Sequence, residues 1–231
     1  METIIQVENV VKSFNQGSKK VEVLEGINLT VQENQLIALR GRSGSGKTTL
    51  LNLLGALDKP TSGDIYFKDK HLNKLSEKQR SEIRRTEMGF VFQSYGLVPL
   101  MSVEENVEFG LRIAGVPRSE WQENIEESLE LVGLTKRKKH RPFELSGGEQ
   151  QRVAIARAVA VKPKLILADE PTAELDSKMA FRIIHAFQEL VKRTSTTIIM
   201  TTHDPGILEI LDHVYILEDK KIAYQKKENI I

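Results

Sequence analysis

Apolar and polar residues alternate along much of the first third of the chain, which is the period of a half-buried strand. An apolar run at Leu36–Leu39 also has the length of a strand. The sequence Pro-Thr-Ser-Gly-Asp at 60–64 marks a turn before another short apolar run. We therefore predict strands over Ile4–Val11, Val21–Leu24, Ile27–Val31, Leu36–Leu39 and Ile65–Phe67.

The middle of the chain changes to a helical period after one further predicted strand, Gly89–Phe92. Ser119 and Gln122 have the spacing of a capping box, which predicts the start of a helix. Gly133 is placed to end that helix. A stripe of large apolar side chains recurs along it, and we interpret this stripe as core packing: Trp121, Ile125, Leu129 and Val132.

Helices alternate with short apolar strands in the last third of the chain. A helix is predicted over Gln150–Ala160, and strands over Leu165–Ala168, Thr197–Met200 and Val214–Leu217. Strands separated by helices need crossover connections, which favour a mainly parallel sheet. The pattern predicts an α/β fold.

Composition narrows the class of protein. The 231 residues include 33 Lys plus Arg and 32 Asp plus Glu, so the chain lacks the basic excess of a nucleic-acid-binding protein, and no nucleic-acid partner is expected. Cysteine is absent, which excludes disulfides and thiolate metal sites. The first residues alternate like a strand and not like a signal peptide, and no run of about 18 apolar residues occurs. We expect a chain that does not itself span a membrane.

One local departure from charge balance is the basic stretch Lys136–Arg141. It has two interpretations. The first is a solvated charged turn, and the second is contact with anionic lipid headgroups or with an acidic loop of a partner.

A glycine-rich segment follows the strand Leu36–Leu39 and precedes an apolar-faced helix. It fits the pattern G-x-x-x-x-G-K-[ST], in which backbone N–H groups surround the phosphates of a nucleotide. The lysine of this pattern reaches the β- and γ-phosphates, and the threonine hydroxyl binds Mg²⁺ at the start of the helix. The predicted ATP-binding residues here are Gly41, Arg42, Ser43, Gly44, Ser45, Gly46, Lys47, Thr48 and Thr49.

Two carboxylates end the predicted strand Leu165–Ala168. Ligands of parallel α/β sheets bind at the carboxyl ends of the strands, which is where Asp169 and Glu170 are expected to lie. Asp169 is predicted to bind Mg²⁺, and Glu170 to act as the base or to orient water. His203 follows the strand Thr197–Met200 and is expected at the same edge. Asp204 and Pro205 after it have the order of an N-cap and a first helical residue.

The segment Leu145–Gln150 supplies a second candidate anion site. Ser146 and Glu149 have the spacing of a capping box, which would begin a helix without any ligand. Gly147 and Gly148 also leave the backbone N–H groups of that helix start open to close approach. Both interpretations are compatible with one structure.

These motifs together resemble those of ATP-binding cassette (ABC) ATPases, over essentially the whole chain and in the family's order. The resemblance implies that Phe14 stacks on adenine, that Gln93 contacts Mg²⁺ and the attacking water, and that His203 senses the γ-phosphate. It also implies a homodimer, in which Ser146, Gly147 and Gly148 of one subunit cover the ATP held by the other. Phe14 stands where tyrosine is more usual, and Ala173 stands where glycine or serine is common.

The same resemblance implies a single ABC ATPase domain over residues 1–231. It would comprise a phosphate-loop core with a mainly parallel sheet, an N-terminal antiparallel β subdomain, and a helical subdomain at about 94–147. A single cassette without long coiled coils favours a transporter motor over the DNA-maintenance and translation-associated members of the superfamily. The motor is expected at the cytoplasmic face of the cell membrane, held there by a permease that docks near Gln93–Met101.

The sequences of three segments are most similar to those of ATPases in the bacterial lipoprotein-releasing, macrolide-efflux and antimicrobial-peptide-resistance group. The ATPases of amino-acid and metal importers share much of this sequence, so an importer ATPase is the alternative function. The segments are Leu51–Gly63, Gly89–Gln93 and Ile166–Ser177.

Overall fold

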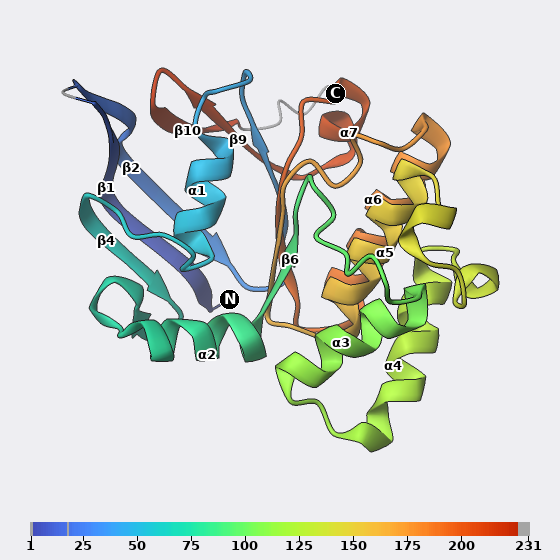
Figure 1. The fold of residues 1–231 in the computed structure, drawn as a ribbon. Coiled ribbons are helices and arrows are strands. Elements are labelled where there is room, and N and C mark those ends of the chain that lie inside the picture. Colours follow the sequence, from blue (N-terminus) through green and yellow to red (C-terminus); the bar gives the residue numbers. More distant parts are fainter. Residues whose placement is uncertain (1, 18, 226–231) are drawn as a thin grey trace.

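A computed structural model describes residues 2–17 and 19–225 of the chain. An antiparallel sheet with the strand order β2-β1-β4-β5 lies at one side of the molecule (Figure 1). Its strands are β1 (Thr3–Gln16), β2 (Lys19–Gln32), β4 (Ser62–Phe67) and β5 (Lys70–His71).

The second sheet has six strands in the order β10-β9-β3-β8-β7-β6. The pairs from β9 to β6 are all parallel, and only the edge strand β10 pairs antiparallel. This sheet confirms the mainly parallel α/β fold. Its strands are β3 (Leu36–Arg40), β6 (Met88–Val91), β7 (Leu165–Ala168), β8 (Thr197–Thr201), β9 (His213–Glu218) and β10 (Lys221–Gln225).

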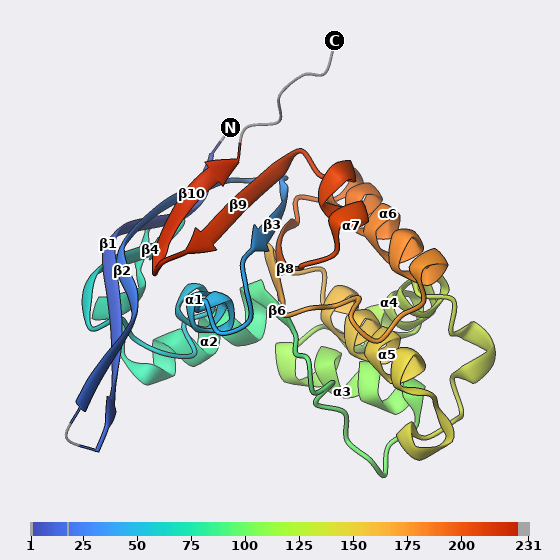
Figure 2. The ribbon, with the colours of Figure 1, turned by 90° about the horizontal axis from the view of Figure 1, so that it is seen from above.

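Helices cover both faces of the six-stranded sheet. Figure 2 shows α1 and α2 on the side of the antiparallel sheet, and α3, α5 and α6 on the other side. The α-helices are α1 (Lys47–Leu54), α2 (Glu77–Glu87), α3 (Val103–Ala114), α4 (Arg118–Leu131), α5 (Gly147–Ala160), α6 (Ser177–Arg193) and α7 (Pro205–Ile210). Short 3₁₀ turns occur at Leu72–Lys74, Thr135–Arg137 and Pro142–Glu144.

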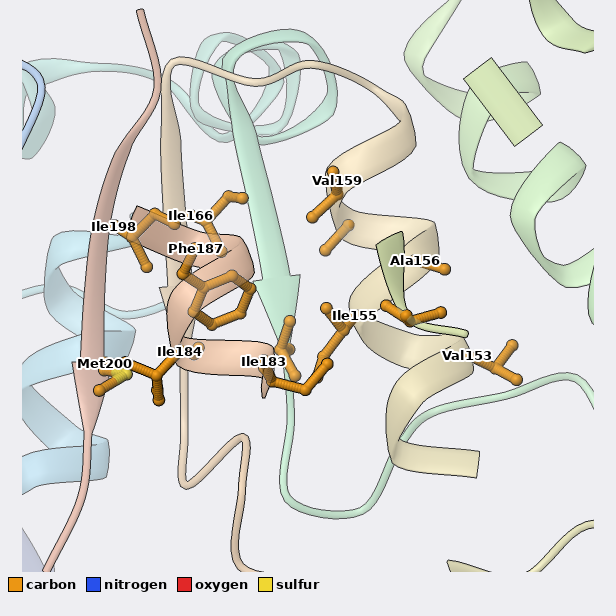
Figure 3. Packing of buried hydrophobic residues seen from close by; sticks show 14 of the residues in the cluster. Val153, Ile155, Ala156, Val159, Ile166, Ile183, Ile184, Phe187, Ile198 and Met200 are labelled. Atoms are coloured by element: carbon orange, nitrogen blue, oxygen red, sulfur yellow. The ribbon is translucent and has the colours of Figure 1, made fainter. Parts of the chain in front are cut away.

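Alternate residues of the central strands enter two separate hydrophobic cores. Ile199 of β8 packs with α1 and the antiparallel sheet, whereas its neighbours Ile198 and Met200 pack with α5 and α6. The second core is shown in Figure 3, where Phe187 of α6 lies among side chains of the strands and of α5. Phe187 is fully buried, and truncation of such a side chain to alanine typically costs about 3–5 kcal/mol. The sheet thus holds its strand ends in fixed register between two packed layers.

Two predicted elements differ from the structure. The strands predicted at Val21–Leu24 and Ile27–Val31 are one strand, β2, because Gly26 adopts a left-handed φ of 64° within a bulge and does not form a turn. The capping box predicted at Ser119 was wrong, because α4 already begins after Pro117 and has no side-chain cap.

The helical region between β6 and α5 contains α3, α4 and the last two 3₁₀ turns. Trp121 packs against the core of this region, as predicted, and its indole N–H donates to the carbonyl of Val116 at 2.8 Å. Arg112 and Arg118 lie over its ring at 5.8 and 5.4 Å from the ring centroid. None of the helices in the described part of the chain is long and apolar enough to cross a membrane.

Candidate nucleotide-binding and hydrolysis site

The parallel strands bring most of the predicted site residues to one edge of the six-stranded sheet. Strand β8 lies between β3, which leads into the phosphate loop, and β7, which ends at Asp169. Strand β6 pairs with β7, and the Asp169 N–H donates to the carbonyl of Val91 at 2.8 Å. The segments that follow these strands therefore emerge side by side. They carry the phosphate loop, Asp169, Glu170, His203 and Gln93.

The phosphate loop folds tightly around the buried ammonium of Lys47. This group donates to the carbonyls of Gly41 and Arg42 at 2.8 and 3.0 Å. A Cβ on Gly41 would lie 2.4 Å from the backbone oxygen of Leu217, so a larger residue cannot take this path. Gly46 ends the loop with a left-handed φ of 103°. The glycines thus serve the close packing of the loop.

The start of α1 lacks the partners that a helix N-terminus usually has. Gly46 is its N-cap, no side chain caps the helix, and its first turn contains no acidic residue. The buried hydroxyl of Ser45 also has no hydrogen-bond partner among the residues that the structure describes. Exposed N–H groups, a positive helix end and a buried lysine together fit the phosphates of a nucleotide.

A chain of hydrogen bonds links the phosphate loop to the end of β7. The Thr48 hydroxyl donates to one carboxylate oxygen of Asp169 at 2.7 Å, and the Thr201 hydroxyl donates to the other at 2.7 Å. The hydroxyl and carboxylate oxygens that Mg²⁺ prefers thus adjoin each other, which fits the predicted metal residues Thr48 and Asp169. Thr201 was not predicted as a site residue. Its position at the end of a buried strand, ahead of His203, was the available signal.

Glu170 is held in an unusual backbone conformation. Its φ is 48°, and its N–H donates to the Thr201 hydroxyl at 2.8 Å. The Glu170 carboxylate lies 3.4 Å from Nδ1 of His203, whose side chain is 71% exposed. A non-glycine residue in this region costs about 1–3 kcal/mol and is typical of functional sites. In this conformation the Glu170 carboxylate lies beside His203. Asp204 caps α7 and Pro205 is its first residue, as predicted.

Gln93 and Phe14 lie at the periphery of this arrangement. Gln93 is exposed and is the second residue of an irregular segment, which we call the Gln93 loop (residues 92–102). Phe14 is exposed on the β1–β2 ribbon, with the Lys12 ammonium 4.8 Å from its ring centroid. A Cβ on Gly46 would meet Val23 of β2 at 3.0 Å, so this ribbon lies against the phosphate loop.

The segment Leu145–Gln150, which we call the signature segment, forms a helix start that, unlike the start of α1, has a side-chain cap. Ser146 is the N-cap of α5, its hydroxyl accepts from the Glu149 N–H at 3.2 Å, and the Glu149 carboxylate accepts from the Ser146 N–H at 2.9 Å. This backbone N–H lowers the pKa of the Glu149 carboxyl below its ordinary value. The helix begins at Gly147, three residues before the predicted start. The predicted capping box is confirmed.

The structure does not bring the signature segment to the phosphate loop of its own chain. Helices α1 and α5 pack on opposite faces of the six-stranded sheet (Figure 2). Ser146, Gly147 and Gly148 instead adjoin the loop after β7, where a Cβ on Gly148 would lie 2.8 Å from the Glu174 carbonyl oxygen.

The basic stretch Lys136–Arg141 is tied partly to its own chain. Arg137 pairs with Glu149 at 3.1 Å, and Lys139 pairs with Glu104 at 2.6 Å. These pairs fit the charged-turn interpretation for two of its residues.

Comparison with known proteins identifies the family. The family profile described as ABC transporter matches residues 24–173. A "Lipoprotein-releasing system ATP-binding protein LolD" of Saccharophagus degradans is 44% identical over 215 residues, which cover 93% of this chain and 94% of that protein. An "Uncharacterized ABC transporter ATP-binding protein YknY" of Bacillus subtilis is 40% identical and covers 95% of each chain.

Solved structures show the same fold. The ATP-binding cassette MJ0796, in a dimeric post-hydrolysis state bound to ADP and Pi, matches with a TM-score of 0.91 at 36% identity, over 98% of this chain and 100% of that one. A second dimeric structure of MJ0796, described as a bacterial ABC transporter cassette, matches with a TM-score of 0.92. With a matching family profile and relatives of this identity and coverage, the chain belongs to the ABC transporter family, as an ATPase cassette.

Proposed function

We propose that this chain is the ATP-hydrolysing motor subunit of a bacterial ABC transporter of the efflux or mechanotransmission type. The observation that carries the proposal is the hydrogen-bond chain Thr48–Asp169–Thr201–Glu170, which joins the phosphate loop to the acidic end of β7. In this chain the proposed magnesium ligands Thr48 and Asp169 adjoin Glu170, the proposed base, and this proximity supports the proposal. That is the arrangement which phosphoryl transfer to water requires.

Each predicted residue has a task in this reaction. The loop amides and Lys47 bind the phosphates, and Phe14 stacks on adenine. Thr48, Asp169 and Gln93 would hold Mg²⁺, and the bound ion would neutralise charge that develops on the phosphates. Glu170 orients the attacking water and accepts its proton, and His203, 3.4 Å from Glu170, meets the γ-phosphate.

A second copy of the chain completes the site. Because α1 and α5 pack on opposite faces of the sheet, the signature residues of one chain cannot cover the nucleotide on its own phosphate loop. A two-fold symmetric dimer solves this problem, since it places Ser146, Gly147 and Gly148 of each subunit opposite the phosphate loop of the other. The dimeric state of MJ0796 supports this arrangement.

A separate permease is proposed to dock beside the Gln93 loop and to hold the motor at the cytoplasmic face of the membrane. A groove of about 210 Å³ runs between α2, α3 and α5, and its lining includes Phe92, Phe109 and Ile113. Phe92 and Ile113 are exposed, and Leu100 in the same loop is 80% exposed. An apolar face of a short permease helix fits this groove and the neighbouring loop.

Two leucines of the proposed docking segment differ in exposure. Leu97 is partly buried against the core, whereas Leu100 is exposed. Leu100 is therefore the proposed contact residue of the two. The relatives named for lipoprotein release favour that group of permeases, and the importer alternative remains with no specific observation in its favour.

Hydrolysis is tested directly with Asp169→Asn. Purified wild-type chain should hydrolyse ATP only with Mg²⁺ present, and the variant should lose most of this activity because the magnesium-binding pair is broken. Wild-type activity that persists in excess EDTA would contradict the proposed role of the Thr48–Asp169 pair.

Docking is tested with Phe92→Asp combined with Leu100→Asp. The double variant should bind ATP normally but no longer be recovered with membranes that contain the permease. The matched control is Phe143→Asp, because Phe143 is 73% exposed but lies outside the groove. If the double variant were recovered with these membranes as fully as wild type, the permease would dock at another surface.

A further inference from the structure

Arg157, in the last turn of α5, reaches from the helix that begins at Ser146 to the Gln93 loop. Its two terminal nitrogens donate to the carbonyls of Gly96 and Tyr95 at 2.5 and 2.9 Å. Within residues 2–17 and 19–225 it makes no ion pair, and burial lowers the pKa of its guanidinium. A half-buried cation without a carboxylate is costly, so its hydrogen bonds to the loop are its main compensation.

The stem of Arg157 is clamped as tightly as its head. Helix α3 passes close to it at Gly110, where a Cβ would lie 2.9 Å from Cγ of Arg157 and 3.4 Å from its carbonyl oxygen. Any larger residue at this position would displace the arginine. The side chain is therefore fixed between α3 and α5 before its guanidinium reaches the loop.

The two carbonyls that Arg157 holds belong to a strained turn. Tyr95 and Gly96 have left-handed φ values of 61° and 59°, and two such residues in sequence are rare when one of them has a side chain. A guanidinium presents parallel N–H donors in one plane and can hold two neighbouring carbonyls at once. An ammonium acts as a single point and lacks this geometry.

The same turn touches the other end of α5. A Cβ on Gly147 would lie 3.1 Å from the hydroxyl oxygen of Tyr95, so the phenol lies against the signature segment. Burial, and the nearby carboxylate of Glu174, raise the pKa of this phenol. Helix α5 thus meets the Gln93 loop at both of its ends, through Gly147 and through Arg157.

We infer that Arg157 is a positioning residue that makes the turn after Gln93 and the signature helix one rigid unit. This inference rests on the proposed function: Gln93 then meets the magnesium of one nucleotide, while Ser146 on the same unit meets the nucleotide of the second subunit. When a docked permease displaces the loop, Gln93 and Ser146 therefore move together, and both nucleotides are affected at once.

The test compares Arg157→Met and Arg157→Lys with a matched control, Arg80→Met. Arg80 is buried on α2 and likewise donates to two backbone carbonyls, those of Ala56 and Asp58, but does not touch the Gln93 loop. The measurements on the full chain are kcat and KM for ATP, the thermal midpoint, and amide hydrogen exchange of residues 94–98.

Arg157→Met should lower kcat roughly ten- to hundredfold, because a displacement of about 1 Å in a catalytic site has this effect. Its KM should stay within about threefold, since the phosphate loop is untouched, and exchange at 94–98 should rise at least about tenfold. Arg80→Met should lower the thermal midpoint without changing kcat or this exchange. Arg157→Lys should fall between wild type and Arg157→Met in kcat.

Two outcomes separate the inference from the proposed function. If Arg157→Met and Arg80→Met have the same kcat and the same exchange at 94–98, while wild type hydrolyses ATP, the positioning role is overturned and the proposed function stands. If wild type and Arg80→Met hydrolyse no ATP, the proposed function itself fails.

Discussion

The two helix starts that are proposed to meet nucleotide are built in opposite ways. Helix α1 begins at Gly46 without a side-chain cap, beside a buried serine hydroxyl that has no partner. Helix α5 begins at Ser146 with a closed capping box. The first therefore needs an anion to satisfy its N–H groups, whereas the capping box of the second already satisfies the N–H groups of Ser146 and Glu149. From this difference we expect the α1 site to bind nucleotide first and the α5 site to recognise the bound nucleotide afterwards.

The largest expected effect is that of changing Glu170, the proposed base for the water that attacks the bound nucleotide. Glu170→Gln should lower kcat by two to four decades, about 3–5 kcal/mol, because an amide cannot accept the proton of water. ATP binding should persist, since α1 and its loop are unchanged. Steady-state hydrolysis of the purified variant within threefold of wild type would remove Glu170 from this role.

The next effect comes from mixing two variant subunits, which tests whether the two helix starts of different subunits act on one nucleotide. Lys47→Ala damages the α1 site, and Ser146→Arg damages the α5 site, so each variant alone should be nearly inactive. An equal mixture forms dimers of which half contain one intact composite site, and about a quarter of wild-type activity should return. If α5 were only a capped helix, Ser146→Arg alone would lose about 1 kcal/mol of stability and keep the activity of its folded fraction.

Stability should also distinguish the two starts. Ser146→Ala removes a cap and should lower the free energy of unfolding by about 1 kcal/mol. Ser45→Ala removes a buried hydroxyl without a partner and should change stability by less than about 0.5 kcal/mol. Denaturant unfolding without nucleotide measures both. A larger loss of stability for Ser45→Ala than for Ser146→Ala would contradict the proposed difference between the two helix starts.

The smallest expected effect is a dependence on pH at α5 alone. The Ser146 N–H lowers the pKa of Glu149 from 4.5, so the bond contributes stability above about pH 4.5 and loses it as pH falls through the lower folded value. The unfolding free energies of wild type and Glu149→Gln should differ by about 0.3–1 kcal/mol at pH 7 and converge in acid. A difference that stays constant down to pH 3 would contradict this assignment. The first turn of α1 has no acidic residue and therefore adds no such pH dependence to the unfolding free energy.

Local patterns predicted what depends on near neighbours in the sequence. The phosphate loop, the capping box at Ser146 and the cap at Asp204 each involve residues within a few positions of one another, and the last two are confirmed as caps. Ser119 shows the limit of this approach, because α4 already begins at Arg118 after Pro117, so that Ser119 lies inside the helix and does not cap it.

Contacts between distant residues escaped prediction for a physical reason. Thr201 holds Asp169 across 32 positions, and Arg157 holds Tyr95 across 62. A threonine at a strand end, or an arginine on a helix, has no periodicity that reveals its partner. Such contacts exist only once the sheet has set the register of its strands.

Trp121 gives the chain a built-in optical probe. It is the sole tryptophan of the sequence, and it lies in the first turn of α4 with two arginines over its ring. Indole emission responds to nearby charge and solvent, so its wavelength and intensity report the surroundings of this one region. The core that carries the phosphate loop contains no tryptophan and is silent in the same spectrum. A change in emission on addition of ATP would therefore record movement transmitted to the helical region, without any label attached.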